Sequence, residues 1–150
     1  MRALLAAALL LSIFILFGPH RGFGLSENSP GEARVIRMER SGMPEIRLER
    51  KGNEWEIKTP VRGLARPDMV RNLLAVLDAK SDRKLEAKDL SRFGLDRPVL
   101  RLIIDSQEYD FGMLNPLTGQ QYVRKGGAVF LISPKYALVP SLSELEADHA

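Results

Sequence analysis

The residues best suited to a specific contact lie in one segment, Asn115–Lys125. A polar loop begins at Asn115 and leads into a short stretch where Tyr122 and Arg124 are separated by one apolar residue. On a strand, Tyr122 and Arg124 share one face. There a guanidinium can hold a carboxylate or phosphate while the aromatic ring shields it from water. The candidate interaction or ligand residues are therefore Asn115, Tyr122, Arg124 and Lys125.

A purely structural interpretation of this segment is also open. In it, Arg124 pairs with an acid on the adjacent strand, and Tyr122 packs against the core. Both interpretations use the same strand alternation, so the sequence pattern alone does not separate them.

Most catalytic chemistry is excluded by what the chain lacks. It has no cysteine, and therefore no thiolate nucleophile and no zinc or iron–sulfur site based on thiolates. Of its two histidines, His20 lies beside an apolar run and His149 is the penultimate residue. No phosphate-binding glycine loop, dinucleotide fingerprint, nucleophile elbow or zinc-protease motif occurs. We expect no catalytic, cofactor-binding or metal-binding residue, and a protein that is not an enzyme.

Three acids, Asp105, Glu108 and Asp110, crowd one predicted turn. A calcium loop needs oxygen ligands at fixed positions around a central glycine, and a glycosidase needs two carboxylates on facing elements. The three acids instead flank a turn between two strands, where charge is usual. We therefore expect neither a metal site nor an acid/base pair there.

The net charge of +3 does not indicate nucleic-acid binding. Two of the 22 basic residues, Arg2 and Arg21, precede residue 22, and the remaining 20 face 19 acids. Because these charges are interleaved, they form no dense basic stripe that could displace counterions from a phosphate backbone.

The N-terminal segment indicates export. Residues 3–17 are all apolar except Ser12 and would span about 22 Å as a helix, against roughly 30 Å for the hydrocarbon core. That length suits a signal-peptide core or a short anchor. We expect residues 1–21 to be a signal anchor that holds a single-pass protein in the inner membrane, with its domain in the periplasm. The alternative is a signal peptide cleaved after Gly24, which would release the domain into the periplasm.

The rest of the chain predicts a stalk followed by one α+β domain. Residues 22–32 are rich in turn formers and are expected to be a flexible stalk, with the domain covering 33–150. Between residues 33 and 59, apolar and charged residues alternate with period two, which predicts a three-stranded antiparallel meander. Pro67 then begins a helix with one apolar stripe, formed by Val70, Leu73, Leu74 and Leu77.

The second half predicts four more strands, at residues 99–105, 109–113, 121–125 and 128–133. Before them, residues 80–88 are expected to be a loop, and Gly94 is expected to stop a short helical turn. Gly126-Gly127 predicts a tight hairpin. A broken helix follows, in which Ser141 and Glu144 have the spacing of a capping box.

The chain also resembles the bacterial family catalogued as domain of unknown function 4340. The residues that carry the resemblance occur in the family's order between Arg34 and Leu145: Leu48–Ile57, Pro60, Asp68, Leu73-Leu74, Leu77, Asp89-Leu90, Phe93–Asp96, Pro98, Phe111-Gly112, Tyr122–Arg124 and Val129–Ile132. The resemblance implies a membrane-anchored extracytoplasmic α+β domain, found in some proteins linked to ABC-type transport or gliding machinery. It implies no catalytic residues.

Two functions are therefore expected. The first is a non-enzymatic envelope domain, anchored through residues 3–17, that binds another envelope protein and is accessory to a transport complex. The alternative is an extracytoplasmic module that binds an anionic envelope molecule through Tyr122, Arg124 and neighbouring basic side chains.

Overall fold

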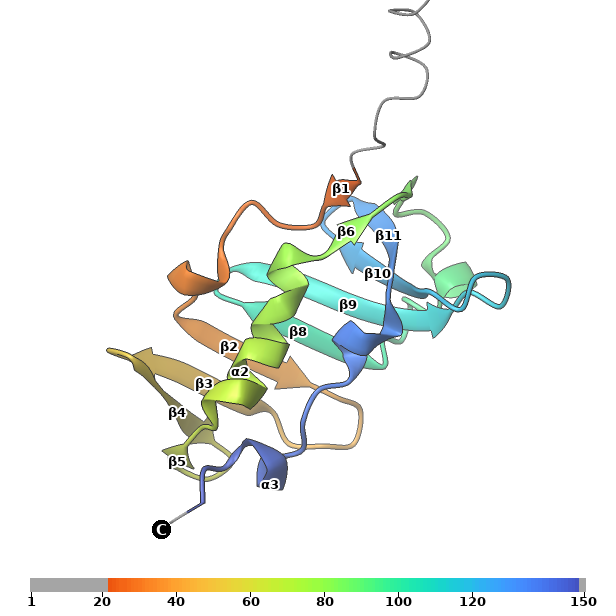
Figure 1. Cartoon of the computed structure of the whole chain (residues 1–150). Coiled ribbons are helices and arrows are strands. Elements are labelled where there is room, and N and C mark those ends of the chain that lie inside the picture. Colours follow the sequence, from red (N-terminus) through yellow and green to blue (C-terminus); the bar gives the residue numbers. More distant parts are fainter. Residues whose placement is uncertain (1–21, 149–150) are drawn as a thin grey trace, which may run out of the picture.

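The computed structural model describes residues 22–148, which fold around one antiparallel sheet (Figure 1). Its nine strands lie in the order β5-β4-β3-β2-β8-β9-β10-β11-β7. They are β2 (Val35–Glu39), β3 (Ile46–Lys51), β4 (Glu54–Thr59), β5 (Gly63–Leu64), β7 (Lys84–Glu86), β8 (Leu100–Ile104), β9 (Gln107–Leu114), β10 (Gln121–Lys125) and β11 (Ala128–Ile132). Two short strands, β1 (Phe23–Gly24) and β6 (Lys80–Ser81), form a separate ladder.

The helices are few and short. They are α2 (Pro67–Leu74), α3 (Leu142–Leu145), and the 3₁₀ turns Pro30–Glu32, Ala75–Asp78, Leu90–Phe93 and Pro134–Ala137. Within residues 22–148, no helix is both long enough and apolar enough to cross a membrane. The α+β class predicted from the sequence is confirmed, whereas the expected N-terminal hydrophobic helix lies outside the described residues.

The two predicted groups of strands form one continuous sheet. They meet where β2 pairs with β8, with Ile36 opposite Ile104 and Met38 opposite Leu102. All four side chains are almost fully buried. A shift of one residue would turn this apolar set to the opposite face, so burial specifies the register of the junction.

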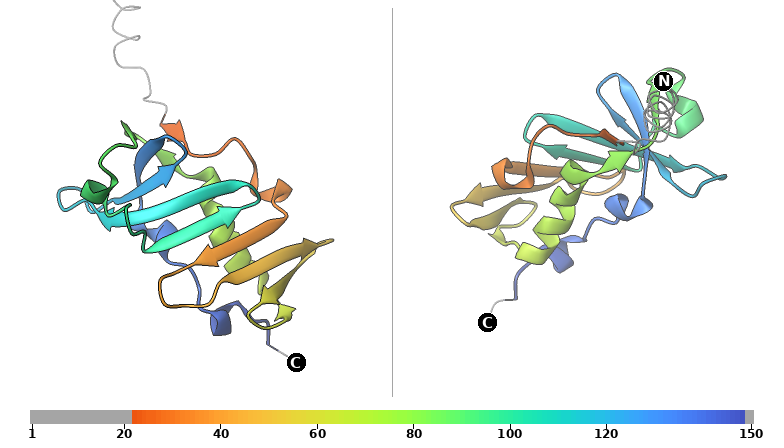
Figure 2. Two further views of the ribbon diagram at one scale, coloured as in Figure 1. Left: turned by 180° about the vertical axis from the view of Figure 1, so that it is seen from behind. Right: turned by 45° about the horizontal axis from the view of Figure 1, so that its top comes forward.

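Helix α2 covers one face of the sheet, here called the inner face (Figure 2). The predicted apolar stripe is buried in the main core, with Val70, Leu73 and Leu74 on α2 and Leu77 in the 3₁₀ turn that follows it. Inward-facing residues of the strands complete that core, among them Ile36, Leu48, Ile57, Leu102, Ile104, Phe111 and Val123.

The chain uses both faces to cross the sheet. From the β5 edge it runs along α2 over the inner face to the opposite edge at β7. It then returns to the middle through the 3₁₀ turn Leu90–Phe93 on the other face, here called the outer face. The ring of Phe93 lies 4.8 Å from that of Tyr122, whose neighbour Val123 points into the main core.

Two segments expected to be irregular lie against the domain. In the expected stalk, Phe23 and Gly24 pair with β6, and the apolar side chain of Leu25 is buried. In the expected loop of residues 80–88, β6 pairs with β1 and β7 extends the sheet beside β11. The polar composition of residues 80–88 indicated a loop, although they contain β6 and β7. Both strands are short and lie at sheet edges, where charged side chains stay solvated, so their sequence resembles that of a loop.

Two hairpin turns can be compared with the predicted ones. The turn between β8 and β9 contains only Asp105 and Ser106, because Asp105 adopts a positive φ of 54° and closes it in two residues. The predicted tight hairpin between β10 and β11 is confirmed: Lys125 lies opposite Ala128, and Gly126 has a positive φ of 58°.

The C-terminal segment closes the inner face at the β5 edge. The predicted capping box is confirmed, since Glu144 accepts hydrogen bonds from the backbone N–H and the hydroxyl of Ser141. These bonds hold the pKa of Glu144 below its ordinary value. Leu145 is fully buried, and its carbonyl accepts a hydrogen bond from the N–H of Arg66, just before α2.

Gly112 on β9 allows the 3₁₀ turn Leu90–Phe93 to approach the outer face, and this contact is testable. A Cβ added there would lie 2.1 Å from the carbonyl oxygen of Phe93, so Gly112→Ala must displace the turn. We expect the free energy of unfolding to fall by about 2 kcal/mol or more. The matched control is Gly63→Ala on β5, where a Cβ meets nothing within 4 Å. Urea denaturation measures both, and equal stability of the two variants would contradict the tight contact.

Candidate functional site

The outer face between β4 and β9 has no covering helix and carries ion pairs (Figure 2). The pairs that connect its basic and acidic side chains are Arg47–Glu49 at 2.8 Å, Arg37–Glu45 at 3.9 Å, and Glu56 with both Lys51 and Lys58. Hydrogen bonds from Lys58 and Lys51 hold the pKa of Glu56 below its ordinary value. Because these pairs are partly exposed to solvent, each adds little stability, but together they leave the surface with mixed charge.

Arg101 on β8 is the centre of the densest ion-pair cluster described on this face. Its Nε lies 2.8 Å from Oδ1 of Asp110 and 2.9 Å from Oε1 of Glu108, and its Nη1 lies 3.7 Å from Glu39. The side chain of Asp110 is only 6% exposed. The hydrogen bond that Arg101 donates to Asp110 raises the pKa of Arg101 above its ordinary value. The cluster therefore neutralises a buried carboxylate on the face that lacks a helix.

Sequence reasoning missed Arg101 because its partners come from two other strands. Sheet register places it opposite Asp110 of β9 and Glu39 of β2. The pairing of β8 with β9 follows from a short hairpin, but that of β8 with β2 joins residues about sixty positions apart. No local pattern signals such a contact.

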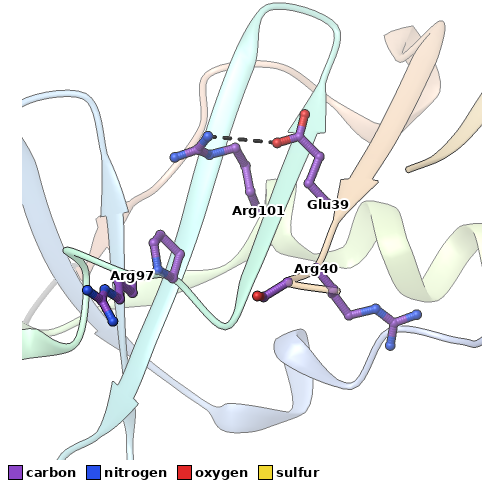
Figure 3. Close-up of a pocket in the computed structure, with 6 residues that line it drawn as sticks. Glu39, Arg40, Arg97 and Arg101 are labelled. Carbon is purple, nitrogen blue, oxygen red and sulfur yellow. Dashed lines mark ion pairs between the residues drawn. The ribbon is translucent and has the colours of Figure 1, made fainter. Parts of the chain in front are cut away.

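Two shallow clefts flank Arg101. One, of about 380 Å³, is lined by Glu39, Arg40, Ser41, Arg97, Pro98 and Arg101. Figure 3 shows the side chains of Arg40 and Arg97 extending in opposite directions, while Arg101 is paired with Glu39. The cleft is rich in arginine, but its guanidinium groups do not converge on one point as they would around a bound anion.

The second cleft, of about 280 Å³, contains one of the predicted interaction residues, Arg124. It is lined by Arg101, Glu108, Asp110, Arg124 and Gly126. Arg124 lies opposite Asp110 in the sheet register, and its Nε donates to the carbonyl oxygen of Gly126 at 3.2 Å. Because the carboxylates of Glu108 and Asp110 line this cleft, it is unfavourable for a bound anion.

Lys125 lies on the other face of the sheet from Arg124, as strand alternation requires. Its Nζ is 5.6 Å from the ring centre of Tyr109, a buried residue of the main core. Burial lowers the pKa of Lys125, and the nearby charge of Glu27 opposes that shift. The structure therefore separates two cations that are adjacent in the sequence.

Asn115 and Tyr122 are brought together. Nδ2 of Asn115 donates to the hydroxyl of Tyr122 at 3.0 Å, and Oδ1 accepts the N–H of Leu117 at 2.8 Å. The backbone of Asn115 adds bonds to the N–H of Gly119 and to the carbonyl of Gln120. These contacts hold the loop of residues 115–120 in one conformation.

That ordered loop exposes apolar side chains at one end of the sheet. Leu117 at its tip is 93% exposed, and three further exposed residues lie where β9 ends and β8 begins: Val99, Met113 and Leu114. The N–H of Val99 donates to the carbonyl of Phe111, which places Val99 beside the second half of β9. We refer to Val99, Met113, Leu114 and Leu117 as the apolar end.

The three acids considered from the sequence have separate contacts. Oδ1 of Asp105 accepts the N–H groups of Arg34 and Val35, both at 2.9 Å, whereas Glu108 and Asp110 pair with Arg101. Among residues 22–148, no group of three acidic or histidine side chains is placed to hold a metal ion.

The architecture defines an α+β domain built on a large antiparallel sheet with one helix-covered face. Residues 55–147, more than half of the chain, match the family model described as domain of unknown function DUF4340. The chain belongs to this family, as the resemblance in its sequence indicated. Searches of curated proteins and of solved structures gave no match.

The Arg101 cluster predicts a stability difference between two arginines. Arg101→Met leaves the buried carboxylate of Asp110 without its cation, and we expect a loss of about 1–3 kcal/mol in the free energy of unfolding. Arg47→Met breaks only an exposed pair and should cost less than about 1 kcal/mol.

Adding Asp110→Asn to Arg101→Met removes the unpaired charge and should restore part of the loss. Chemical denaturation compares the three variants. A loss for Arg101→Met no greater than that for Arg47→Met would mean that water solvates Asp110.

Proposed function

We propose that this protein is a non-enzymatic component of the cell envelope. Residues 3–17 anchor it in the inner membrane, and its periplasmic domain binds another envelope protein as an accessory of a transport complex. The apolar run at residues 3–17 supports the anchoring, and membership of the DUF4340 family is compatible with a binding role.

The observation that carries the proposal is the apolar end. Its four exposed apolar residues lie on neighbouring segments, and grouped apolar side chains mark interaction sites more often than single exposed ones. Leu117 stands on a loop already held by Asn115 and Tyr122, so a partner would lose little conformational entropy in ordering it. Asn115 and Tyr122 thus have positioning roles in this proposal.

The alternative, a module for an anionic envelope molecule based on Tyr122 and Arg124, has weaker support. The Tyr122 hydroxyl is bonded to Asn115, and Arg124 shares its cleft with Glu108 and Asp110.

Site-specific photocrosslinking in intact cells tests the protein-binding function. A photoreactive residue at Leu117 should give a discrete adduct with one envelope protein, whereas the same residue at Val61, an exposed apolar position between β4 and β5, should not. Leu117→Ser combined with Met113→Ser should reduce co-purification of that partner at least tenfold, with an unchanged melting temperature.

Identical adducts from both positions would argue against a specific surface. Absence of any adduct at Leu117, together with turnover of a substrate by the purified protein, would replace the proposal with an enzymatic one.

A further inference from the structure

The chain enters the domain at a fixed point. Phe23 and Gly24 pair with Ser81 and Lys80, and the N–H of the buried Leu25 donates to the carbonyl of Ala79 at 3.2 Å. Gly22 is already close to the domain, since a Cβ there would lie 3.0 Å from the carbonyl oxygen of Ser81. The position at which the preceding residues leave the domain is therefore set by backbone pairing.

The distance from this point to the apolar run is short. Five residues, 18–22, separate Phe17 from Phe23, so a fully extended chain between these two residues spans at most about 22 Å. The apolar run of residues 3–17 is shorter than the hydrocarbon core is thick, so the end of the run cannot extend far beyond that core. If residues 3–17 anchor the protein, as proposed above, the β1 region must lie close to the lipid headgroups.

A hollow with basic side chains lies beside β1. It has a volume of about 410 Å³ and is lined by Leu25, Lys84, Lys125, Gly126, Gly127, Ala128 and Phe130. The apolar residues are buried, whereas Lys84 is exposed and Lys125 is half-buried. Figure 1 shows β1, β6 and β11 together at one end of the domain, where the described part of the chain begins.

The charges around the hollow favour an anion. Within the part of the chain that the structure describes, Lys84 and Lys125 form no ion pair, and neither do their exposed neighbours Lys80 and Arg83. The nearby acids are Glu27, which acts on Lys125 through space, Asp82, in the turn after β6, and Glu86, which lies opposite Ala128 and is paired with Lys88 at 2.8 Å.

Phe23 adds an apolar component to the same region. Its side chain is 48% exposed although its backbone is paired in β1. Aromatic side chains are enriched at the level of the lipid headgroups, where one part of the ring contacts acyl chains.

We infer that this end of the domain docks on the membrane, with Lys84 and Lys125 binding the phosphates of anionic phospholipids and Phe23 in the headgroup layer. The inference rests on the proposed anchoring and extends it, because a tether alone would leave the domain free to rotate. Each basic contact should favour the docked orientation about fivefold on an anionic surface. The apolar end lies outside this docking surface, since Lys125 and Gln121 lie at opposite ends of β10.

The test uses the full-length chain in lipid nanodiscs and benefits from the absence of native cysteine. A fluorophore is attached at Gly127→Cys, where a new side chain meets nothing within 4 Å, and in a second protein at Ser143→Cys on α3. Lipids with a nitroxide on the headgroup quench nearby fluorophores. We expect strong quenching at residue 127 in discs with 30% phosphatidylglycerol, weaker quenching in pure phosphatidylcholine, and little at residue 143 in either.

Charge variants test the role of the hollow. Lys84→Gln with Lys125→Gln should reduce quenching at residue 127 in anionic discs to the phosphatidylcholine level, and Lys84→Arg with Lys125→Arg should preserve it. The control variant, Lys51→Gln with Arg62→Gln, removes the same number of charges near β4 and should leave the quenching at residue 127 unchanged. Melting temperatures verify that all variants are folded.

Three outcomes would overturn the inference. Equal quenching at residues 127 and 143 would mean that the domain has no preferred orientation on the membrane. Quenching at residue 127 that changes neither with lipid charge nor in the Gln variants would mean that the domain is only tethered. Both leave the proposed anchoring intact. A chain that fails to enter nanodiscs would remove the anchoring itself, and the docking with it.

Discussion

Helix covers only one face of the nine-stranded sheet, and the other features of the domain follow from that asymmetry. Alternate residues of each strand must be apolar to seal the inner face against α2, while their neighbours must be compatible with water. Leu102 and Ile104 point into the main core, whereas Arg101 points outward into its carboxylate cluster. On the outer face, acidic and basic side chains alternate and pair with one another, so this face is compatible with water and carries no strong local electric field.

The outer face changes character at β10 and β11. Val129 and Leu131 lie there and are buried outside the main core, so they need cover of their own. The 3₁₀ turn Leu90–Phe93 supplies part of it through the contact of Phe93 with Tyr122, and Gly112 leaves the space. The connection that returns the chain from the β7 edge to β8 therefore also completes the packing.

With both faces satisfied, the surfaces left for binding are at the two ends of β10. One end carries the apolar loop ordered by Asn115, and the other carries the hollow with Lys84 and Lys125 beside the entering chain. This arrangement is compatible with the proposed membrane docking at the hollow, which leaves the apolar end free for a protein partner. Lys125 and Arg124 belong to different surfaces because successive side chains of a strand alternate.

Local pattern was enough to predict the α+β class, the stripe of α2, the capping box at Ser141 and most strands, since period and turn chemistry act over a few residues. It also singled out Asn115 and Tyr122, although not their contact. Only the tertiary structure decided the pairing of β2 with β8, the partners of Arg101 and the packing of residues 22–32. Those contacts join segments far apart in the chain, and they are selected by burial and register, which a local sequence window does not contain.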